Sequence, residues 1–398
     1  MPFSSINFSA ACSILSPIFL LLSLQWGAQA TVQAKALMPS PPQLAASSYL
    51  LFDVDSGEML VEQDADQSLP PASLTKMMTS YIVSSELKNG SIAVDDRVPI
   101  SVKAWRMGGS KMFIREGSEV LLEDLLRGVI IQSGNDASVA LAEHIAGDEF
   151  SFVEMMNQQA QLLGMTETHF VNATGWPAEG HVTTARDLSR LARALIDDFP
   201  QHYALYSEKE FTYNNITQPN RNGLLWRDQF VDGIKTGHTE EAGYCLVASA
   251  KRKDMRLVAI VMGAKSSRAR EQEAQKLLSY GFRYFSTHRL YSEQEVISSP
   301  KLWAGAEESL NLFLDEALIV TLPRGQREDL QALIEVDKRI VAPVVAGQRY
   351  GELQLRLDDK LLATRQLIAV RAVESASWYA RLWDHIVLFF IDALGLAP

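Results

Sequence analysis

The chain has 398 residues, of which 47% are hydrophobic and 21% are charged, and its formal net charge is −11. This length and composition suit one large globular domain with a smaller one. The acidic balance argues against a nucleic-acid partner, because a phosphate backbone requires clustered Lys and Arg. It also disfavours attraction to anionic lipid, so binding to a membrane surface would have to come from apolar side chains.

The N-terminal segment predicts export. Residues 1–30 contain no Asp, Glu, Lys or Arg, residues 14–24 form an apolar stretch, and Ala28-Gln29-Ala30 has the small-x-small pattern of a cleavage site. We expect a signal peptide over residues 1–30, cleaved after Ala30 or Ala36, and a linker over residues 31–44. The alternative interpretation is a buried N-terminal helix.

The two cysteines carry little information about the redox compartment. Cleavage of the leader would remove Cys12 and leave Cys245 without an intramolecular partner. Because Cys245 stands in an apolar run, we expect it to be a small core residue.

The next elements predict a first domain over residues 45–289. Apolar runs at 48–54 and 58–62 flank Asp55-Ser56-Gly57, a sequence typical of a hairpin turn. Further along the chain the periodicity predicts helices, then strands, then a helix: helices near 73–88, 122–146, 151–163 and 184–197, strands at 243–250 and 256–262, and a helix at 268–285. This order indicates an α/β (α+β) sheet domain with helices clustered in the middle of the chain.

Residues 290–376 predict a second, smaller domain. Leucines alternate with polar residues over 353–357, which is the period of a strand, and short apolar runs occur at 317–322 and 332–336. Gly and Pro separate these runs. We expect a small all-β domain without catalytic residues.

The last segment, residues 377–398, has a different pattern. Its apolar residues recur at helical spacing: Trp378, Leu382, Trp383, Ile386, Val387, Phe390 and Leu394. Only residues 386–391 are continuously apolar, whereas a spanning helix needs about 20 such residues. We therefore predict an amphipathic helix lying in a membrane interface. The alternative is a terminal helix docked on the protein's own core.

Three short motifs carry the chemistry: SLTK at 73–76, SGN at 133–135 and KTG at 235–237. Each pattern is weak alone, since S-x-x-K also occurs at 85–88 and 298–301. The copy at 73–76 follows Pro70-Pro71-Ala72, which predicts that it starts a helix. There Lys76 lies one turn after Ser73 and on the same face.

A serine at this position becomes a nucleophile only if a base takes its proton. Lys76 can be that base if burial and a second cation lower its pKa, and Lys235 is the expected cation. Gly237 has no side chain, so we expect an extended substrate to approach the edge strand there.

Together the motifs resemble those of low-molecular-mass penicillin-binding proteins of the serine-type D-alanyl-D-alanine carboxypeptidase family. The resemblance runs from about residue 45 to the C-terminus, with its longest matches at 71–76, 128–136, 220–226, 231–239 and 243–250. It implies a transpeptidase domain like that of penicillin-binding proteins and β-lactamases. It also implies peptidoglycan stem peptides ending in D-Ala-D-Ala as substrates, acylation by β-lactam antibiotics, and a location on the periplasmic face of the bacterial inner membrane.

The resemblance also implies roles for individual residues. Ser73 would be the acylated nucleophile and Lys76 its general base. Ser133 would relay a proton to the leaving D-alanine nitrogen, and Lys235 would supply positive potential.

Six further residues are expected to bind the substrate: Asn135, Arg221, Thr236, Gly237, His238 and Arg270. Asn135 would hydrogen-bond the peptide chain, and Thr236 would contact the terminal carboxylate. The backbone N–H groups of Ser73 and His238 would form an oxyanion hole. The two arginines would organise the carboxylate-binding end, although Arg270 could instead lie on a solvated helix face.

Other functions stay open at this point. A β-lactamase would need a base for deacylation, and the nearest candidates, Glu167 and Glu179, do not stand in the expected E-x-x-x-N pattern. A DD-endopeptidase and a catalytically silent wall-binding scaffold are the remaining alternatives. No metal or cofactor is expected, because the seven histidines show no paired ligand spacing.

Overall fold

The computed structural model describes residues 38–293 and 295–395. The predicted signal peptide, both candidate cleavage sites and Cys12 therefore lie outside the described residues. The predicted linker is described only from residue 38 onward.

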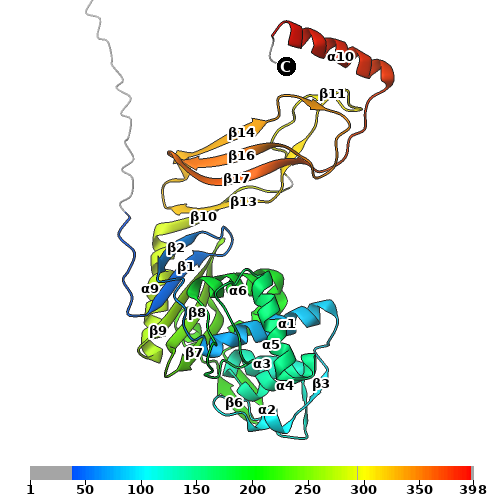
Figure 1. Ribbon diagram of the computed structural model, residues 1–398. Coiled ribbons are helices and arrows are strands. Elements are labelled where there is room, and N and C mark those ends of the chain that lie inside the picture. Colours follow the sequence, from blue (N-terminus) through cyan, green and yellow to red (C-terminus); the bar gives the residue numbers. More distant parts are fainter. Residues whose placement is uncertain (1–37, 294, 396–398) are drawn as a thin grey trace, which may run out of the picture. The chain divides into compact units, whose positions relative to one another are not determined.

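A five-stranded sheet of order β2-β1-β9-β8-β7 organises the first domain (Figure 1). Its strands are β1 (Ser48–Asp53), β2 (Met59–Gln63), β7 (Val231–Thr239), β8 (Gly243–Arg252) and β9 (Met255–Ala264). Every neighbouring pair is antiparallel. The predicted hairpin at the start of this domain is confirmed as β1 and β2.

Helices cover both faces of this sheet, which is why its central strands read as long apolar runs. Alternate residues of β1 belong to different cores: Leu50 and Phe52 pack with the helical cluster, whereas Tyr49 and Leu51 pack toward α9 (Ser267–Tyr284). The helical cluster consists of α1 (Lys76–Asn89), α3 (Leu122–Arg127), α4 (Asn135–Ala146), α5 (Glu149–Leu162) and α6 (Ala185–Asp198). Cys245 is fully buried beneath this cluster, as predicted.

Short elements connect the larger ones. They are η1 (Ala72–Thr75), β3 (Arg97–Pro99), α2 (Val102–Arg106), β4 (Glu119–Leu121), α7 (Pro200–Tyr203), η3 (Ala204–Ser207), β5 (Glu210–Tyr213), β6 (Ile216–Pro219) and α8 (Leu224–Arg227).

The prediction of one continuous helix over residues 122–146 is wrong. After α3 the chain makes a single π turn, η2 (Gly128–Gln132), and Ser133 then adopts a left-handed conformation with φ 63°. The helix restarts as α4, where the backbone N–H of Asn135 donates to the carbonyl oxygen of Ser110 at 2.7 Å. The polar residues 132–136 mark this break in the sequence, and Ser133 is buried there, with 2% exposure.

The predicted all-β segment is present. β10 (Phe285–Tyr291) pairs with β13 (Leu318–Pro323), and a four-stranded sheet has the order β12-β17-β16-β14. The remaining strands are β11 (Leu302–Trp303), β12 (Leu312–Leu314), β14 (Leu330–Val336), β15 (Ile340–Val341), β16 (Arg349–Leu357) and β17 (Lys360–Ala369). A 3-10 turn, η4 (Arg327–Asp329), precedes β14. Leu353 and Leu355 are buried in a separate core, as their alternation predicted.

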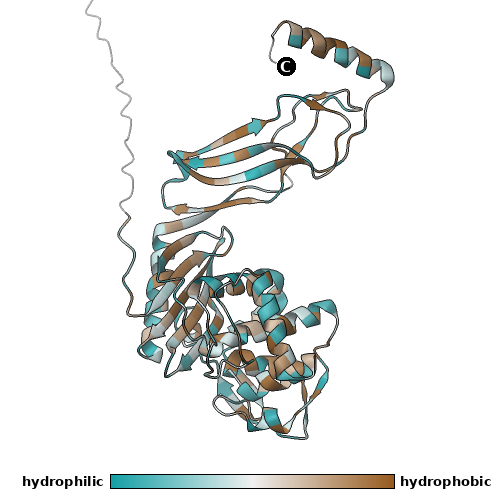
Figure 2. Ribbon diagram, viewed as in Figure 1, coloured by the Kyte–Doolittle hydropathy of each residue, from teal (hydrophilic) through white to brown (hydrophobic). Residues whose placement is uncertain are grey.

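The predicted terminal helix is α10 (Trp378–Ala393). Figure 2 shows hydrophobic residues along much of it, and Trp378 and Trp383 are 71% and 66% exposed. Within residues 38–293 and 295–395, no helix is both long enough and apolar enough to span a membrane.

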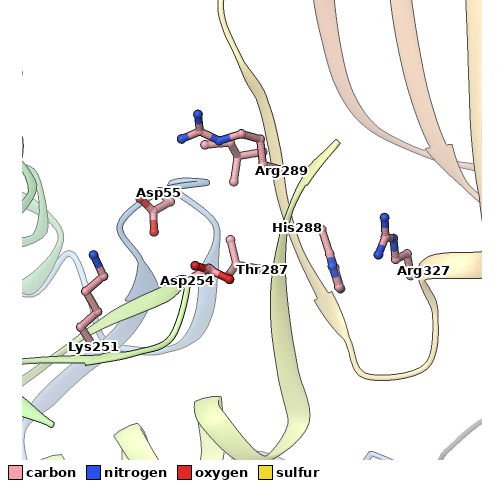
Figure 3. Close-up of a pocket in the computed structure, with 8 residues that line it drawn as sticks. Asp55, Lys251, Asp254, Thr287, His288, Arg289 and Arg327 are labelled. Atoms are coloured by element: carbon pink, nitrogen blue, oxygen red, sulfur yellow. The ribbon is translucent and has the colours of Figure 1, made fainter. Parts of the chain in front are cut away.

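A cavity of about 510 Å³ lies between the turns of the main sheet and strands β10 and β13 (Figure 3). Charged side chains of both signs line it, among them Asp55, Lys251, Arg289 and Arg327. None of the residues predicted to be functional lines this cavity.

Candidate active site

The first motif forms the start of α1. Ser73 lies in the 3-10 turn η1, and Lys76 is the first residue of the α-helix that continues it. Lys76 has 0% exposure, and its Nζ lies 3.2 Å from the Oγ of Ser73. The same amine donates to the Oδ1 of Asn135 at 2.7 Å and to the carbonyl oxygen of Thr174. The candidate base is therefore held at the candidate nucleophile by two further acceptors.

The second and third motifs meet beside it. Ser133 follows the π turn, and its Oγ accepts a hydrogen bond from the Nζ of Lys235 at 2.9 Å. Lys235 lies on β7 and also donates to the carbonyl oxygen of Thr236 at 3.1 Å. Three segments that lie far apart in the sequence thus contribute side chains to one buried polar cluster.

The surroundings of Lys76 and Lys235 disfavour the charged form of both side-chain amines. Burial lowers the pKa of Lys76 from 10.5 to about 7, the Asp136 carboxylate opposes this shift, and the Arg221 guanidinium adds to it. Burial also lowers the pKa of Lys235, and the charges of Lys76, Arg221 and Arg270 lower it further. Because repulsion between the two lysines is mutual, the site disfavours two charged amines at once. The sequence predicted Lys235 as the cation that lowers the pKa of Lys76, whereas the cation found to lower it is Arg221.

Gly237 permits close packing of the protein's own chain. A Cβ atom at this position would lie 3.1 Å from the carbonyl oxygen of Pro71 and 3.3 Å from the Cγ of Leu74. The sequence interpretation assigned the missing side chain to substrate access, whereas its close neighbours are the turn that carries Ser73. The glycine therefore lets β7 pass directly beside the nucleophile.

The neighbours of Gly237 on β7 differ in exposure. Thr236 is buried, whereas His238 is exposed, and the His238 ring centroid lies 3.9 Å from that of Tyr244. Between them, at Gly237, β7 packs against the turn that carries Ser73.

The two predicted arginines occupy different settings. Arg221 donates from Nε to the carbonyl oxygen of Gln132 at 3.1 Å and to its Oε1 at 2.7 Å. Arg270 is only 6% exposed and donates to the carbonyl oxygen of Gly237 at 3.0 Å. Arg270 is therefore buried against the end of β7 and does not lie on a solvated helix face.

Asp136 is a structural support that the motifs did not identify. Its buried carboxylate accepts from the backbone N–H groups of Met112 at 3.0 Å and Phe113 at 2.9 Å. Next to it, the Nδ2 of Asn135 donates to the carbonyl oxygen of Gly108 at 2.8 Å. Together they fix the 108–113 loop against the start of α4. The polar patch after the apolar run at 129–131 was the only signal for this in the sequence.

Thr174 was also missed, because it contributes a backbone carbonyl oxygen that no side-chain pattern reveals. The two glutamates considered as β-lactamase bases are both exposed. Among the described residues, no hydrogen bond joins Glu167 or Glu179 to Ser73, Lys76 or Ser133.

Two family models match the chain. The model described as D-alanyl-D-alanine carboxypeptidase matches residues 35–266, and the one described as penicillin-binding protein 5, C-terminal domain, matches residues 285–375. A D-alanyl-D-alanine carboxypeptidase DacC from Escherichia coli is 42% identical over 386 residues, covering 95% of each chain.

The chain is also similar to a solved structure and to a relative that covers a smaller part of it. The structure of penicillin binding protein 5 from Haemophilus influenzae is 42% identical with a TM-score of 0.81, covering 85% of this chain and all of that one. A D-alanyl-D-alanine endopeptidase from Pseudomonas aeruginosa is 34% identical, covering 58% of this chain and 76% of its own. The first family model spans more than half of the chain, and the catalytic motifs converge in one site, so the chain belongs to the D-alanyl-D-alanine carboxypeptidase family of serine-type peptidases.

Proposed function

We propose that this protein removes the terminal D-alanine from peptidoglycan pentapeptide stems through an acyl-enzyme on Ser73, and that β-lactams acylate the same serine. The observation that carries this proposal is the 3.2 Å contact between the Oγ of Ser73 and the Nζ of fully buried Lys76. The names of the carboxypeptidase relative and of the penicillin-binding structure support the choice of substrate and inhibitor.

Acylation begins when neutral Lys76 accepts the Ser73 proton. The Ser73 oxygen then bonds to the carbonyl carbon of the penultimate D-alanine, and negative charge develops on the carbonyl oxygen. The backbone N–H groups of Ser73 and His238 stabilise that charge. The pKa of about 7 leaves a useful fraction of Lys76 neutral near neutral pH.

Collapse of the tetrahedral intermediate breaks the C–N bond and releases D-alanine. The net proton transfer runs from Ser73 to the leaving nitrogen, with Lys76 as the acceptor and Ser133 as the last donor. Lys235, 2.9 Å from the Oγ of Ser133, orients that hydroxyl. Water then cleaves the ester, which returns a proton to Ser73 and frees the shortened stem as a carboxylic acid.

The substrate carboxylate has a consequence for Lys235. A terminal carboxylate bound at Thr236 would lie next to this amine and favour its charged form. Lys76 would then be the neutral member of the pair, as acylation requires. Arg270 supplies further positive charge at the same end of β7.

The direct test measures free D-alanine after the purified protein is mixed with a pentapeptide ending in D-Ala-D-Ala. The wild type should release D-alanine, and Ser73→Ala should release none while it keeps its melting temperature. The Lys235→Ala variant should also fold but acylate far more slowly. Cleavage of cross-linked dimers without release from the pentapeptide would favour an endopeptidase, and rapid turnover of penicillin would favour a β-lactamase.

The carboxypeptidase assignment is favoured over the endopeptidase by the extent of similarity. The carboxypeptidase relative covers 95% of this chain, whereas the endopeptidase relative covers 58%. The exposure of Glu167 and Glu179 gives no support to a β-lactamase.

We also propose that the protein is exported and binds the periplasmic face of the inner membrane through α10. Large apolar side chains of α10 are exposed, whereas its polar side contacts the β-rich segment through Asp384, which accepts from the Ala304 N–H at 2.7 Å, and Asp392, which pairs with Arg339. The protein without its predicted signal peptide should therefore bind lipid vesicles and rise with them in a flotation assay. Failure of that protein to bind neutral vesicles would contradict an apolar anchor.

A further inference from the structure

In the loop at residues 172–176, one side-chain oxygen, the Oδ1 of Asn172, accepts four hydrogen bonds. The Oδ1 of Asn172 accepts from the backbone N–H groups of Thr174 at 3.1 Å, Gly175 at 2.8 Å and Trp176 at 3.0 Å. It also accepts from the Oγ1 of Thr174 at 2.9 Å. Four donors on one acceptor fix the path of the loop over these residues.

The other side of the same amide is fixed as well. The Nδ2 of Asn172 donates to the carbonyl oxygen of Trp176 at 2.9 Å and faces the Nδ1 of His181 at 3.3 Å. The backbone N–H of Val171 also points at this ring nitrogen, so Nδ1 is an acceptor and the ring proton lies on Nε2. From there His181 donates to the Oγ1 of Thr75, 2.9 Å away in the turn that carries Ser73.

This arrangement directs the carbonyl oxygen of Thr174 at the Nζ of Lys76. We propose that Asn172 is a positioning residue, which holds the Thr174 carbonyl oxygen against Lys76 and thereby sets both the direction and the proton affinity of the general base. The inference rests on the proposed function, since it deepens the role of Lys76 in that site.

The expected effect has a definite sign. A carbonyl acceptor stabilises the ammonium form of Lys76 more than the neutral amine, so losing it should lower the pKa of Lys76 below its value of about 7. Because hydrogen bonds to charged groups are stronger than those between neutral groups, we expect a downward shift of about one pH unit or more. The other titratable or charged groups that face this amine are not themselves substituted: Asp136, Arg221, Lys235 and His181. Burial lowers the pKa of His181 to about 4, so it stays neutral over the tested range of about pH 5.5–9.

Three variants test the proposal. Asn172→Ala removes the acceptor, and Asn172→Asp keeps an oxygen for the four donors while adding a negative charge. Asn157→Ala is the matched control, because Asn157 clamps the backbone of Phe170 on the same loop, at 2.8 and 2.9 Å, without reaching Lys76.

The first readout is the rate of acylation by benzylpenicillin as a function of pH. We expect Asn172→Ala to lower the plateau rate at least about tenfold and to move the acid midpoint downward. Asn172→Asp should recover only part of the rate, because it keeps the acceptor but loses the N–H that faces the Trp176 carbonyl oxygen and His181; its negative charge should move the midpoint upward. Asn157→Ala should leave the midpoint unchanged.

The second readout needs no activity: an NMR titration of the lysine ε-carbon signal that Lys76→Ala removes. An unchanged Lys76 midpoint in Asn172→Ala would overturn the proposal, as would equal losses of rate and melting temperature in Asn172→Ala and Asn157→Ala. If Asn172→Ala does not fold, Asn172→Ser decides, because its shorter side chain withdraws the acceptor from the loop without adding charge; an unchanged Lys76 midpoint in that variant would overturn the proposal. An inactive wild type with the predicted NMR shifts would refute the proposed function alone.

Discussion

Replacing Gly175 with alanine should disrupt the nucleophile turn more than any nearby glycine substitution. Gly175 has φ +81°, and a Cβ atom there would lie 1.8 Å from the carbonyl oxygen of Ala72 and 2.9 Å from the backbone nitrogen of Ser73. The neighbours are backbone atoms, which cannot rotate away as a flexible side chain could. Either the loop or the turn carrying Ser73 must therefore move.

Gly180 in the same loop provides the control. It has φ +77°, and a Cβ atom there would have nothing within 4 Å. The Gly180→Ala variant should carry only the cost of a left-handed backbone, about 1–2 kcal/mol. The Gly175→Ala variant should carry that cost and the displacement of backbone, for a total of about 4 kcal/mol or more.

Thermal unfolding and penicillin labelling together measure the two effects. At about 2–4 °C per kcal/mol, we expect a loss of about 2–8 °C for Gly180→Ala and of about 8 °C or more for Gly175→Ala. Only Gly175→Ala should also slow labelling. Equal melting temperatures and equal labelling rates for the two variants would refute the close approach of the loop to the turn.

Three further predictions follow from the same geometry. First, the labelling rate at fixed benzylpenicillin should rise about tenfold per pH unit up to the Lys76 pKa of about 7 and then level off, because the base must be neutral; a rate that falls with rising pH would exclude this base. Second, Asp136→Asn should destabilise the fold by about 3 kcal/mol in urea denaturation, because an amide cannot accept from all the N–H groups of the 112–114 segment. The same substitution should lower the pKa of Lys76. An unchanged midpoint of urea denaturation would contradict the structural role of Asp136. Third, deleting residues 377–398 should abolish vesicle binding and leave D-alanine release intact, and persistent binding would locate the anchor elsewhere.

The three catalytic motifs, at residues 73–76, 133–135 and 235–237, could be predicted because each is a local pattern of side chains. Ser73 and Lys76 are one helical turn apart, so secondary structure alone brings them together. The resemblance to a known family then placed Ser133 and Lys235 in the same site, which the hydrogen bond between them is consistent with.

The supports of the site could not be predicted because they depend on tertiary contacts. Gly128 begins the π turn before Ser133, and a Cβ atom there would lie 2.4 Å from the Sδ of Met112. The carbonyl oxygen of Thr174 has no side-chain signature. Asn172 looks like any loop asparagine until the four donors around it are known.

Strand β17 was missed for a different reason. Its residues 360–369 mix charged and apolar side chains without alternation, and eight of the ten are exposed or only partly buried. The strand is defined by its pairing with β12 and β16, which no short window of sequence contains.

The most direct test of the account is the intact mass of the protein after brief exposure to benzylpenicillin, followed by peptide mapping. We expect one covalent penicilloyl group, located on Ser73, and no adduct in the Ser73→Ala variant. An adduct on any other residue, or a wild type that folds but stays unlabelled, would contradict the assignment of Ser73 and Lys76 as nucleophile and base.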